Sequence, residues 1–135
     1  MFFLPDTVFD LSVYDYVIDA IDTVSGKIEL AVRCDRSGIP IISSMGAGNK
    51  LEPSAFEVDD IYKTSVCPLA RVMRTELKKR GVKKLKVVYS KEKPRTGMLE
   101  GEKRVPASSA FTPSVAGLIM AAEVVKDITG ESGCF

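Results

Sequence analysis

The chain has 135 residues and a formal net charge of +1, with 45% hydrophobic and 27% charged residues. This composition is typical of a globular domain, or of part of a larger one, and it excludes a disordered or fibrous protein. The sequence contains no histidine, which excludes Ser-His catalysis, Cys-His catalysis and histidine-based metal sites within this chain.

The first third of the sequence predicts a strand, a helix and a second strand. Residues 15–20 form a short β-branched run that indicates a buried strand. Apolar residues then recur at helical spacing from Thr23 to about Arg36, with Asp22 before them as the expected N-cap and Gly38 after them. The run Ile39–Ser43 indicates the second strand. Because a helix joins the two strands, we expect them to be parallel, with a right-handed crossover.

The rest of the sequence predicts two further strands and two further helices. Strands are expected over Phe56–Ile61 and residues 84–89, and a helix over Pro68–Lys79. Residues 90–110 carry basic residues among Pro, Gly and Ser without periodicity, which indicates a long loop. The last helix is expected to run from Pro113 to Ile128. Its predicted buried stripe consists of Val115, Leu118, Ile119, Ala122 and Val125.

This element order predicts an α/β fold, but the beginning of the chain is unusual for one. Residues 2–5 (FFLP) are typical of a strand that has already begun, and neither a G-x-G-x-x-G nor a G-x-x-x-x-G-K-[ST] phosphate loop occurs anywhere. We therefore expect residues 1–135 to form either a single domain or the C-terminal half of a larger α/β domain.

The cysteines and the apolar runs exclude several other classes of protein. Cys34, Cys67 and Cys134 form no C-x-x-C pair, so we expect neither a disulfide framework nor a structural zinc site. No apolar run is long enough to span a bilayer, and the N-terminus lacks the basic flank of a secretory signal. These features lead us to expect a cytoplasmic protein with no membrane partner.

Charge is strongly segregated along the chain. Residues 1–62 contain four Lys or Arg against eleven Asp or Glu, whereas residues 63–104 contain fourteen against four. Such segregation predicts one face for cations and another for a polyanion. The alternative is an ordinary lysine-rich surface exposed to solvent.

The residues with the clearest chemical potential follow the two predicted parallel strands. Asp19 and Asp22 lie at the end of the first strand, and the turn containing Gly46 and Gly48 follows the second. Ligands of open α/β sheets gather at this edge, where a carboxylate can hold Mg²⁺ together with phosphate oxygens. Lys27, one turn further along, is either close enough to reach a phosphate or simply exposed to solvent. The structural alternatives are that Asp22 only caps a helix and that the glycines only form a turn.

Cys67 is a second candidate for chemistry. It directly precedes the helix expected to begin at Pro68, and the dipole of a helix favours a thiolate at its N-terminus. The alternative is a half-buried cysteine without a chemical role.

Several of these stretches resemble a known family. Residues 14–22 (YDYVIDAID), Lys27 and residues 39–48 (IPIISSMGAG) resemble the second half of the HesA/MoeB/ThiF superfamily. These ubiquitin-activating-enzyme-like proteins adenylate a carboxylate with ATP. Three further stretches resemble one branch of it, the tRNA threonylcarbamoyladenosine dehydratases: residues 59–71 (DDIYKTSVCPLAR), 87–90 (VVYS) and 111–117 (FTPSVAG).

The resemblance implies a fold and an activity. The implied fold is the second half of a Rossmann-like three-layer α/β domain, in which parallel strands are followed by antiparallel strands and helices cover both faces. The implied activity is ATP-dependent cyclisation of the N6-threonylcarbamoyl group of a tRNA adenosine through an adenylated carboxylate. Asp22 corresponds to the catalytic aspartate that engages Mg-ATP, with Mg²⁺ held through the nucleotide. Lys27 corresponds to a basic residue near it, and Gly46 and Gly48 are expected beside the nucleotide.

The resemblance also implies partners. It implies tRNA binding and a homodimer, and it gives the basic segment a role in contacting RNA phosphates. The family's glycine-rich nucleotide loop precedes the position that corresponds to Met1, so we expect the chain alone to be inactive and to bind ATP weakly. The residues expected to contact RNA are Arg71, Arg74, Lys78, Lys83, Lys84 and Lys86.

Two other functions remain open at this point. The first is an adenylyltransferase for a sulfur-carrier or ubiquitin-like protein, with Cys67 as acceptor and a sulfur-transfer protein as partner. The zinc-binding C-x-x-C pairs of those relatives are missing here. The second is a non-catalytic module that binds RNA or a protein through the basic face.

Overall fold

The computed structural model describes residues 3–48, 50–93 and 110–130. Within these ranges the strands are β1 (Val17–Asp19), β2 (Ile41–Ser44), β3 (Phe56–Asp60) and β4 (Lys86–Ser90). The helices are α1 (Val24–Ser37), α2 (Pro68–Lys79) and α3 (Thr112–Thr129), with short 3-10 turns η1 (Pro53–Ala55) and η2 (Ile61–Lys63). Most of the predicted loop over residues 90–110, and Cys134, lie outside the described residues.

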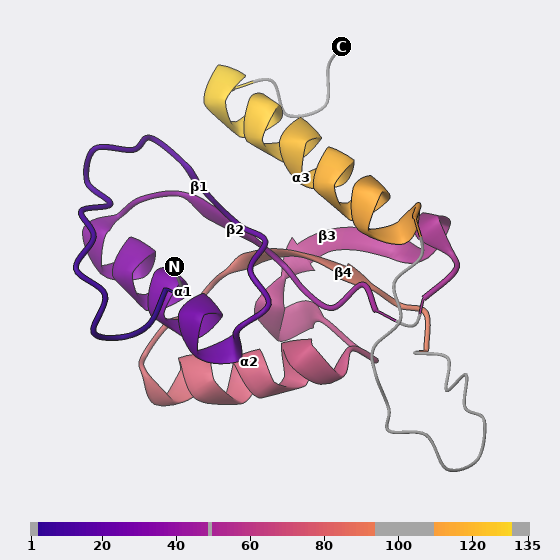
Figure 1. Ribbon diagram of the computed structural model, residues 1–135, viewed down its shortest axis with the longest axis horizontal. Helices are drawn as coiled ribbons and strands as arrows, with labels where there is room; N and C mark the ends of the chain where they lie inside the picture. Colours follow the sequence, from indigo (N-terminus) through magenta and orange to yellow (C-terminus); the bar gives the residue numbers. More distant parts are fainter. Residues whose placement is uncertain (1–2, 49, 94–109, 131–135) are drawn as a thin grey trace.

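The four strands form one mixed sheet in the order β1-β2-β4-β3. β1 pairs with β2, and β2 with β4, in parallel, whereas β3 runs antiparallel to β4. The predicted β1-α1-β2 unit is therefore confirmed, and so is the expected change from parallel to antiparallel strands. Figure 1 shows the consequence for the layers, because α3 lies on one side of the sheet while α1 and α2 lie on the other.

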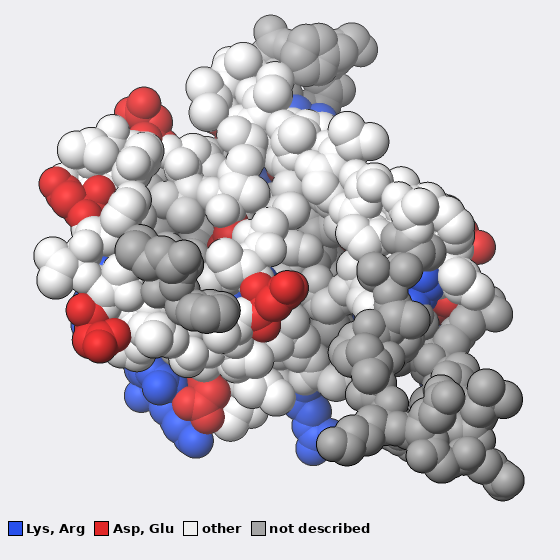
Figure 2. All heavy atoms as spheres, in the orientation of Figure 1, with Lys and Arg blue, Asp and Glu red and all other residues white. Residues whose placement is uncertain are grey.

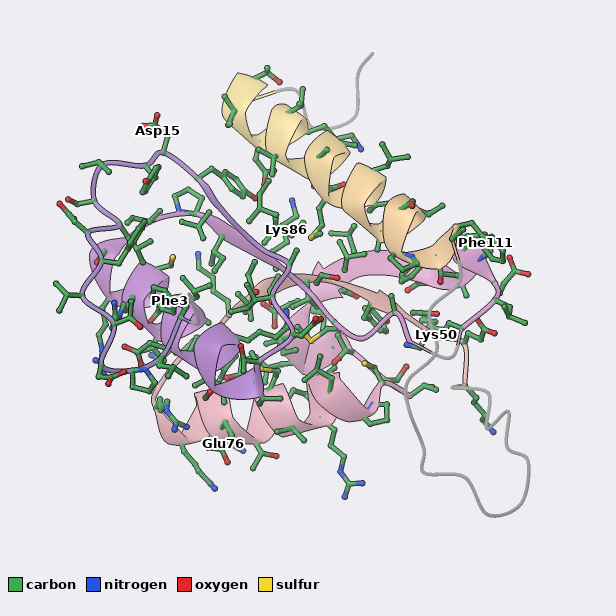
Figure 3. All side chains as sticks on the ribbon, viewed as in Figure 1. Phe3, Asp15, Lys50, Glu76, Lys86 and Phe111 are labelled. Carbon is green, nitrogen blue, oxygen red and sulfur yellow. The ribbon has the colours of Figure 1, made fainter. Side chains whose placement is uncertain are left out.

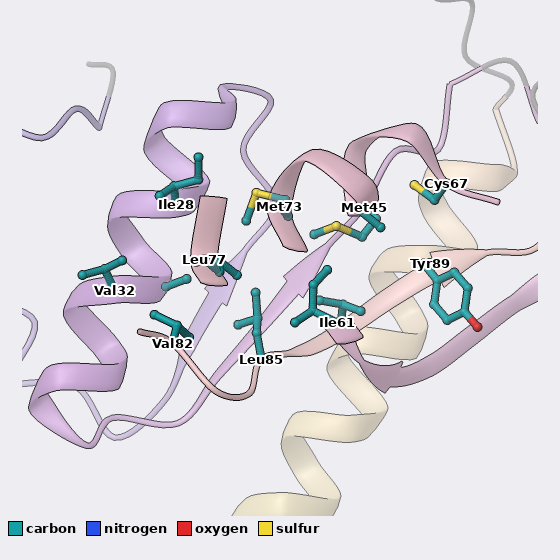
Figure 4. Close-up of a cluster of buried hydrophobic side chains, with 13 residues drawn as sticks. Ile28, Val32, Met45, Ile61, Cys67, Met73, Leu77, Val82, Leu85 and Tyr89 are labelled. Atoms are coloured by element: carbon teal, nitrogen blue, oxygen red, sulfur yellow. The ribbon is translucent and has the colours of Figure 1, made fainter. Parts of the chain in front are cut away.

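The side chains of β4 alternate between two cores, as the period of a strand requires. Val87 belongs to the core between the sheet and the pair α1–α2, which also contains Met73 and Leu77 (Figure 4). Val88 belongs to the opposite core, beneath α3, together with Met120. Both faces of the sheet are thus buried at β4, which accounts for the apolar run over residues 87–89 at the centre of this strand.

The start of α1 differs from the prediction. Its N-cap is Thr23, not Asp22, and the Thr23 side chain makes no capping hydrogen bond. The Thr23 carbonyl accepts the first helical hydrogen bond, from the Lys27 N–H at 3.0 Å. Asp22 is therefore one residue too early to cap the helix, and its side chain is exposed.

The N-terminal segment is also not the strand that was predicted. Met1 and Phe2 lie outside the described residues, and residues 3–5 form no strand. The Thr7 N–H donates to the Leu4 carbonyl at 2.9 Å, which closes a turn at this point. The segment is held against α1 by Arg33, whose guanidinium lies 4.8 Å from the centre of the Phe3 ring and donates to the Thr7 carbonyl.

α3 is rotated relative to its predicted stripe. Ala116 and Met120 are buried against the sheet, with Val115 and Ile119 partly buried beside them. The expected core residues Leu118, Ala122 and Val125 are exposed instead. The helix packs against β2 and β4 along one side only, and its sequence is apolar on several sides, so tertiary contacts determine which stripe is buried. None of the helices in the described ranges is both long and apolar enough to cross a lipid bilayer.

Candidate functional site

The candidate site lies at the carboxyl edge of the parallel strands. β1 ends at Asp19 and β2 at Ser44, and because these strands are parallel neighbours, the turns that follow them emerge at the same edge. The first turn carries Asp22 and the second carries Gly46. In open α/β sheets this edge is where ligands bind.

A buried network of polar groups underlies this edge. Asp19 is fully buried, and the Lys27 side chain, only 3% exposed, places its Nζ 3.2 Å from Asp19 Oδ1. Ser43 Oγ donates to Asp19 Oδ2 at 2.5 Å, and the Ile21 N–H donates to Oδ1 at 3.1 Å. Lys27 Nζ also donates to the Ser44 carbonyl at 2.6 Å. A buried ion pair is tolerated when its remaining donors and acceptors are satisfied in this way.

Asp22 and Gly46 leave groups accessible to a ligand at this edge, next to the buried network. The Asp22 side chain is exposed, and within the described residues its carboxylate has no hydrogen-bond or ion-pair partner. A Cβ built on Gly46 would meet no atom within 4 Å, so a ligand can approach its backbone closely. Gly48 lies in the same turn. The arrangement suits a phosphate-bearing ligand that brings a divalent cation with it.

The donor set fits a cation held through a ligand. Among the described residues, no group of three or more His, Cys, Asp or Glu side chains is placed to bind a metal ion. Mg²⁺ commonly uses one or two carboxylates, phosphate oxygens and water. Asp22 could supply such a carboxylate.

Lys27 does not reach the open edge in this geometry. Its ammonium donates to Asp19 and to the Ser44 carbonyl beneath the turns. The expected contact between Lys27 and a phosphate therefore stays a prediction, and the observed contacts link two strand ends instead.

Lys50 is a buried residue near the site that the sequence did not single out. It is 3% exposed, and its Nζ donates to the Gly46 carbonyl at 2.8 Å, which ties the glycine turn to the next segment (Figure 3). Burial lowers the pKa of Lys50, while nearby Cys67 and Glu92 act in the opposite direction. Nothing in the sequence distinguishes this lysine from a loop lysine, because its burial depends on how the turn folds back.

The six predicted RNA contacts do not form one cluster. Arg71 and Lys78 are exposed on the outer side of α2, and Lys83 and Lys84 are exposed just beyond its end. Figure 2 shows Lys and Arg side chains along this lower edge of the molecule. Two residues depart from the group. Arg74 is partly buried and donates to the Thr64 carbonyl at 3.1 Å. Lys86 lies beneath α3 (Figure 3), where it pairs with Glu123 at 2.7 Å and Asp127 at 3.0 Å.

Comparison with known proteins identifies the family. Residues 6–134 match the ThiF family. The chain belongs to the ThiF family. A tRNA threonylcarbamoyladenosine dehydratase of Bacillus subtilis (strain 168) is 46% identical to it, over 84% of this chain and 50% of that protein. The dehydratase of Escherichia coli (strain K12) is 45% identical over 48% of this chain and 24% of its own length.

Solved structures of the E. coli enzyme, TcdA, share the fold. The complex of TcdA with AMP superposes with a TM-score of 0.77 and 30% identity, and it covers 88% of this chain and 50% of TcdA. The complex with ATP gives a TM-score of 0.75 and 28% identity, and it covers 88% of this chain and 49% of TcdA. This ThiF-family chain thus spans about half the length of the relatives that it matches.

The thiol of Cys67 is buried in this ThiF-family fold. It is the N-cap of α2 but makes no side-chain capping bond, and it is 3% exposed within the core between α2 and the sheet. A buried thiol is poorly placed to accept a sulfur or acyl group from a partner. The geometry therefore does not favour a role for Cys67 as an acceptor.

The opposite, amino edge of the sheet holds a cavity of about 580 Å³, lined among others by Pro40, Lys84 and Asp127. Beside it the Tyr16 hydroxyl donates to Asp127 at 2.7 Å. That hydrogen bond, together with Lys86, lowers the pKa of Asp127. This cluster joins α3 to the sheet, far along the strands from Asp22.

Proposed function

We propose that this chain supplies the aspartate-bearing half of an ATP-dependent tRNA threonylcarbamoyladenosine dehydratase. The proposal rests on one observation above all. A chain 46% identical to the B. subtilis dehydratase carries an exposed aspartate, Asp22, that has no partner among the described residues, at the same carboxyl edge of the parallel strands as an open glycine turn. The E. coli relative crystallised with ATP and with AMP, which supports a nucleotide as the ligand of this edge.

The proposed reaction has two steps. The threonyl carboxylate attacks the α-phosphorus of ATP, which forms an acyl adenylate and releases pyrophosphate. A nucleophilic atom of the same threonylcarbamoyl group then attacks the activated carbonyl, so that the ring closes and AMP leaves with a net loss of water from the modified base. Without histidine, catalysis would rest on positioning and on stabilisation of phosphate charge. In this scheme Asp22 engages Mg-ATP, and the backbone of Gly46 and Gly48 lies against the nucleotide.

A second half of the site is part of this proposal. No glycine-rich phosphate loop occurs in the 135 residues, and the relatives are about twice as long as the matched region. β1 is one of the two outer strands of the described sheet and the one that carries the turn to Asp22, and Ile18 on it is 50% exposed. A further strand could pair with this edge and bring a phosphate loop close to Asp22.

We also propose that tRNA lies along the outer side of α2. Arg71, Lys78, Lys83 and Lys84 are exposed there without acidic partners among the described residues. Such side chains bind phosphates as point charges or forks and position an RNA without reading its bases. The structure offers less support for Arg74 and Lys86, because their donors already contact Thr64 and the acids of α3.

The outer face of α3 supports a further proposal, a homodimer. Leu118, Val125 and Ile128 are 70%, 48% and 63% exposed, and Gly117, Ala121 and Ala122 lie exposed between them. Figure 1 shows no described segment over this side of α3. A contiguous apolar helix face of this kind marks a protein interface.

The test of the proposed function is AMP formation by the full-length protein. With [α-³²P]ATP, AMP should appear only when tRNA carrying N6-threonylcarbamoyladenosine is present, one AMP for each base converted. The control is the same tRNA lacking the threonylcarbamoyl group. AMP formation that is independent of this group, or its absence with the modified tRNA, would refute the proposal.

A further inference from the structure

We propose that Lys27 is a positioning residue: its buried ammonium locks the turn that carries Asp22 to the turn that carries Gly46. This inference rests on the proposed function, because it assigns Lys27 an effect on catalysis through Asp22. It replaces a direct contact between Lys27 and a phosphate.

A single ammonium group reaches two strand ends. Lys27 is on the first turn of α1, yet its Nζ donates both to Asp19, the last residue of β1, and to the carbonyl of Ser44, the last residue of β2. One side chain therefore joins a helix to the carboxyl ends of two adjacent strands. Removing it would leave both ends without this cross-link.

Asp19 connects Lys27 to the backbone before Asp22 and to β2. Its Oδ1 accepts from Lys27 and also from the Ile21 N–H, and Ile21 is the residue directly before Asp22. Its Oδ2 accepts from Ser43, on β2. One carboxylate oxygen thus holds the backbone directly before Asp22, and the other is hydrogen-bonded to β2.

Burial makes the network rigid. Asp19 and Ser43 are fully buried and Lys27 is 2% exposed. No buried side-chain nitrogen or oxygen in the described part of the chain lacks a hydrogen-bond partner. Because a charge in such a place costs much free energy unless it is paired, each member holds the others in position.

Asp22 itself differs from the members of this network. Its carboxylate has no partner of its own within the described residues. Its position therefore depends on the backbone of the turn, which Asp19 and Lys27 hold from below. An active-site group with no direct support depends on such an underlying shell for its geometry.

The experiment uses a charge-neutral pair of substitutions in the full-length protein. Lys27→Met alone leaves the buried Asp19 carboxylate without its counter-charge, and it could prevent folding. The combined variant Asp19→Asn/Lys27→Met removes both charges and keeps similar volumes. The matched control is Lys50→Met, which removes a similarly buried lysine whose one hydrogen bond within the described part of the chain is to the Gly46 carbonyl.

The first measurement is amide hydrogen exchange of the folded variants. The pair variant should exchange about tenfold faster in both turns, residues 20–23 and 44–47, with β4 unchanged. Lys50→Met should accelerate only the second turn. If residues 20–23 of the pair variant exchange at the wild-type rate, the proposal is overturned. This measurement is decisive even if the protein shows no dehydratase activity.

The second measurement separates positioning from phosphate binding. In the pair variant, kcat should fall by about tenfold and half-maximal activity should require more Mg²⁺, because a displaced Asp22 binds the cation less well. At saturating Mg²⁺ the KM for ATP should stay nearly constant, because no group that contacts the phosphates is removed. A raised KM for ATP with an unchanged Mg²⁺ requirement would show direct phosphate contact by Lys27 and would overturn the proposal. Failure of the wild-type protein to form AMP would instead refute the proposed function.

Discussion

Asp22 is the residue on which the proposed chemistry depends most directly. We expect Asp22→Ala in the full-length protein to lower turnover by about 100-fold or more, as the loss of a group that stabilises transition-state charge does. Its side chain is exposed and unpartnered within the described residues, so the free energy of unfolding should change by less than about 0.5 kcal/mol.

The matched control for this change is Asp15→Ala. Asp15 is exposed as well, but it precedes β1 and therefore lies at the other end of that strand (Figure 3). Its loss should leave both turnover and stability unchanged. If Asp22→Ala retains full turnover, the carboxyl edge is not the catalytic edge.

Asp127 makes a prediction about pH. Its hydrogen bond from Tyr16 and its contact with Lys86 lower its pKa in the folded state. A lowered folded-state pKa contributes stability above the unfolded-state pKa of about 3.9, and this contribution disappears as pH falls through the folded value. Wild-type protein should thus be more stable than Asp127→Asn in urea unfolding at neutral pH, and the difference should shrink in acid. If the difference in unfolding free energy between the two proteins is the same in acid as at neutral pH, the pKa of Asp127 is not lowered by folding.

At the residue scale the sequence indicated Asp22 as a candidate, but it did not predict the network of Asp19, Lys27 and Ser43 beneath it. Asp22 could be found because it follows a β-branched run, and the carboxyl ends of such strands are where ligands bind. The partnership of Asp19 and Lys27 could not be found, since it needs Ser43 and Ser44 from the next strand. Those contacts exist only once the register of β1 against β2 is known.

At the scale of elements, the proline and glycine residues at the ends of a helix were more informative than the apolar pattern within it. α2 has the predicted bounds because Pro68 suits the first turn of a helix and Gly81 adopts the left-handed conformation, with φ of 75°, just beyond the end. The stripe of α3 could not be predicted, because apolar residues surround much of this helix. Only its packing against β2 and β4 selects Ala116 and Met120 for the core.

The exposed side of α3 makes a prediction about assembly. Leu118→Glu should convert a dimer of the full-length protein into monomers, because it places a charge in an apolar interface without a partner. Sedimentation velocity gives the outcome. Thr75→Glu on α2, also exposed, is the control and should remain dimeric. A Leu118→Glu protein that still sediments as a dimer would show that α3 does not form the interface.

At the scale of the whole molecule, the segregation of charge along the sequence became a partial segregation in space. Arg71 and Lys78 share the outer side of α2, whereas Lys86 is neutralised beneath α3. The sequence could not reveal this separation, since alternate residues of a strand point to opposite faces and only the position of α3 provides Lys86 with acids.

The remaining surface makes a prediction about RNA. Arg71→Glu/Lys78→Glu in the full-length protein should weaken binding of all tRNAs alike and flatten the slope of log affinity against log salt by about one unit for each lost phosphate contact. Lys86→Gln, as the control, should leave the slope unchanged. Filter binding over a range of salt concentrations measures both. An unchanged slope in the double variant would mean that this side of α2 is only a solvated surface.

We propose that this chain belongs to an enzyme that dehydrates N6-threonylcarbamoyladenosine in tRNA. The most direct measurement is mass spectrometry of the nucleosides released from that tRNA after incubation with the full-length protein and Mg-ATP. We expect the modified adenosine to lose the mass of one water only when ATP is present, and Asp22→Ala to prevent the loss. A modified adenosine of unchanged mass with the wild-type protein, or an equal loss with Asp22→Ala, would contradict it.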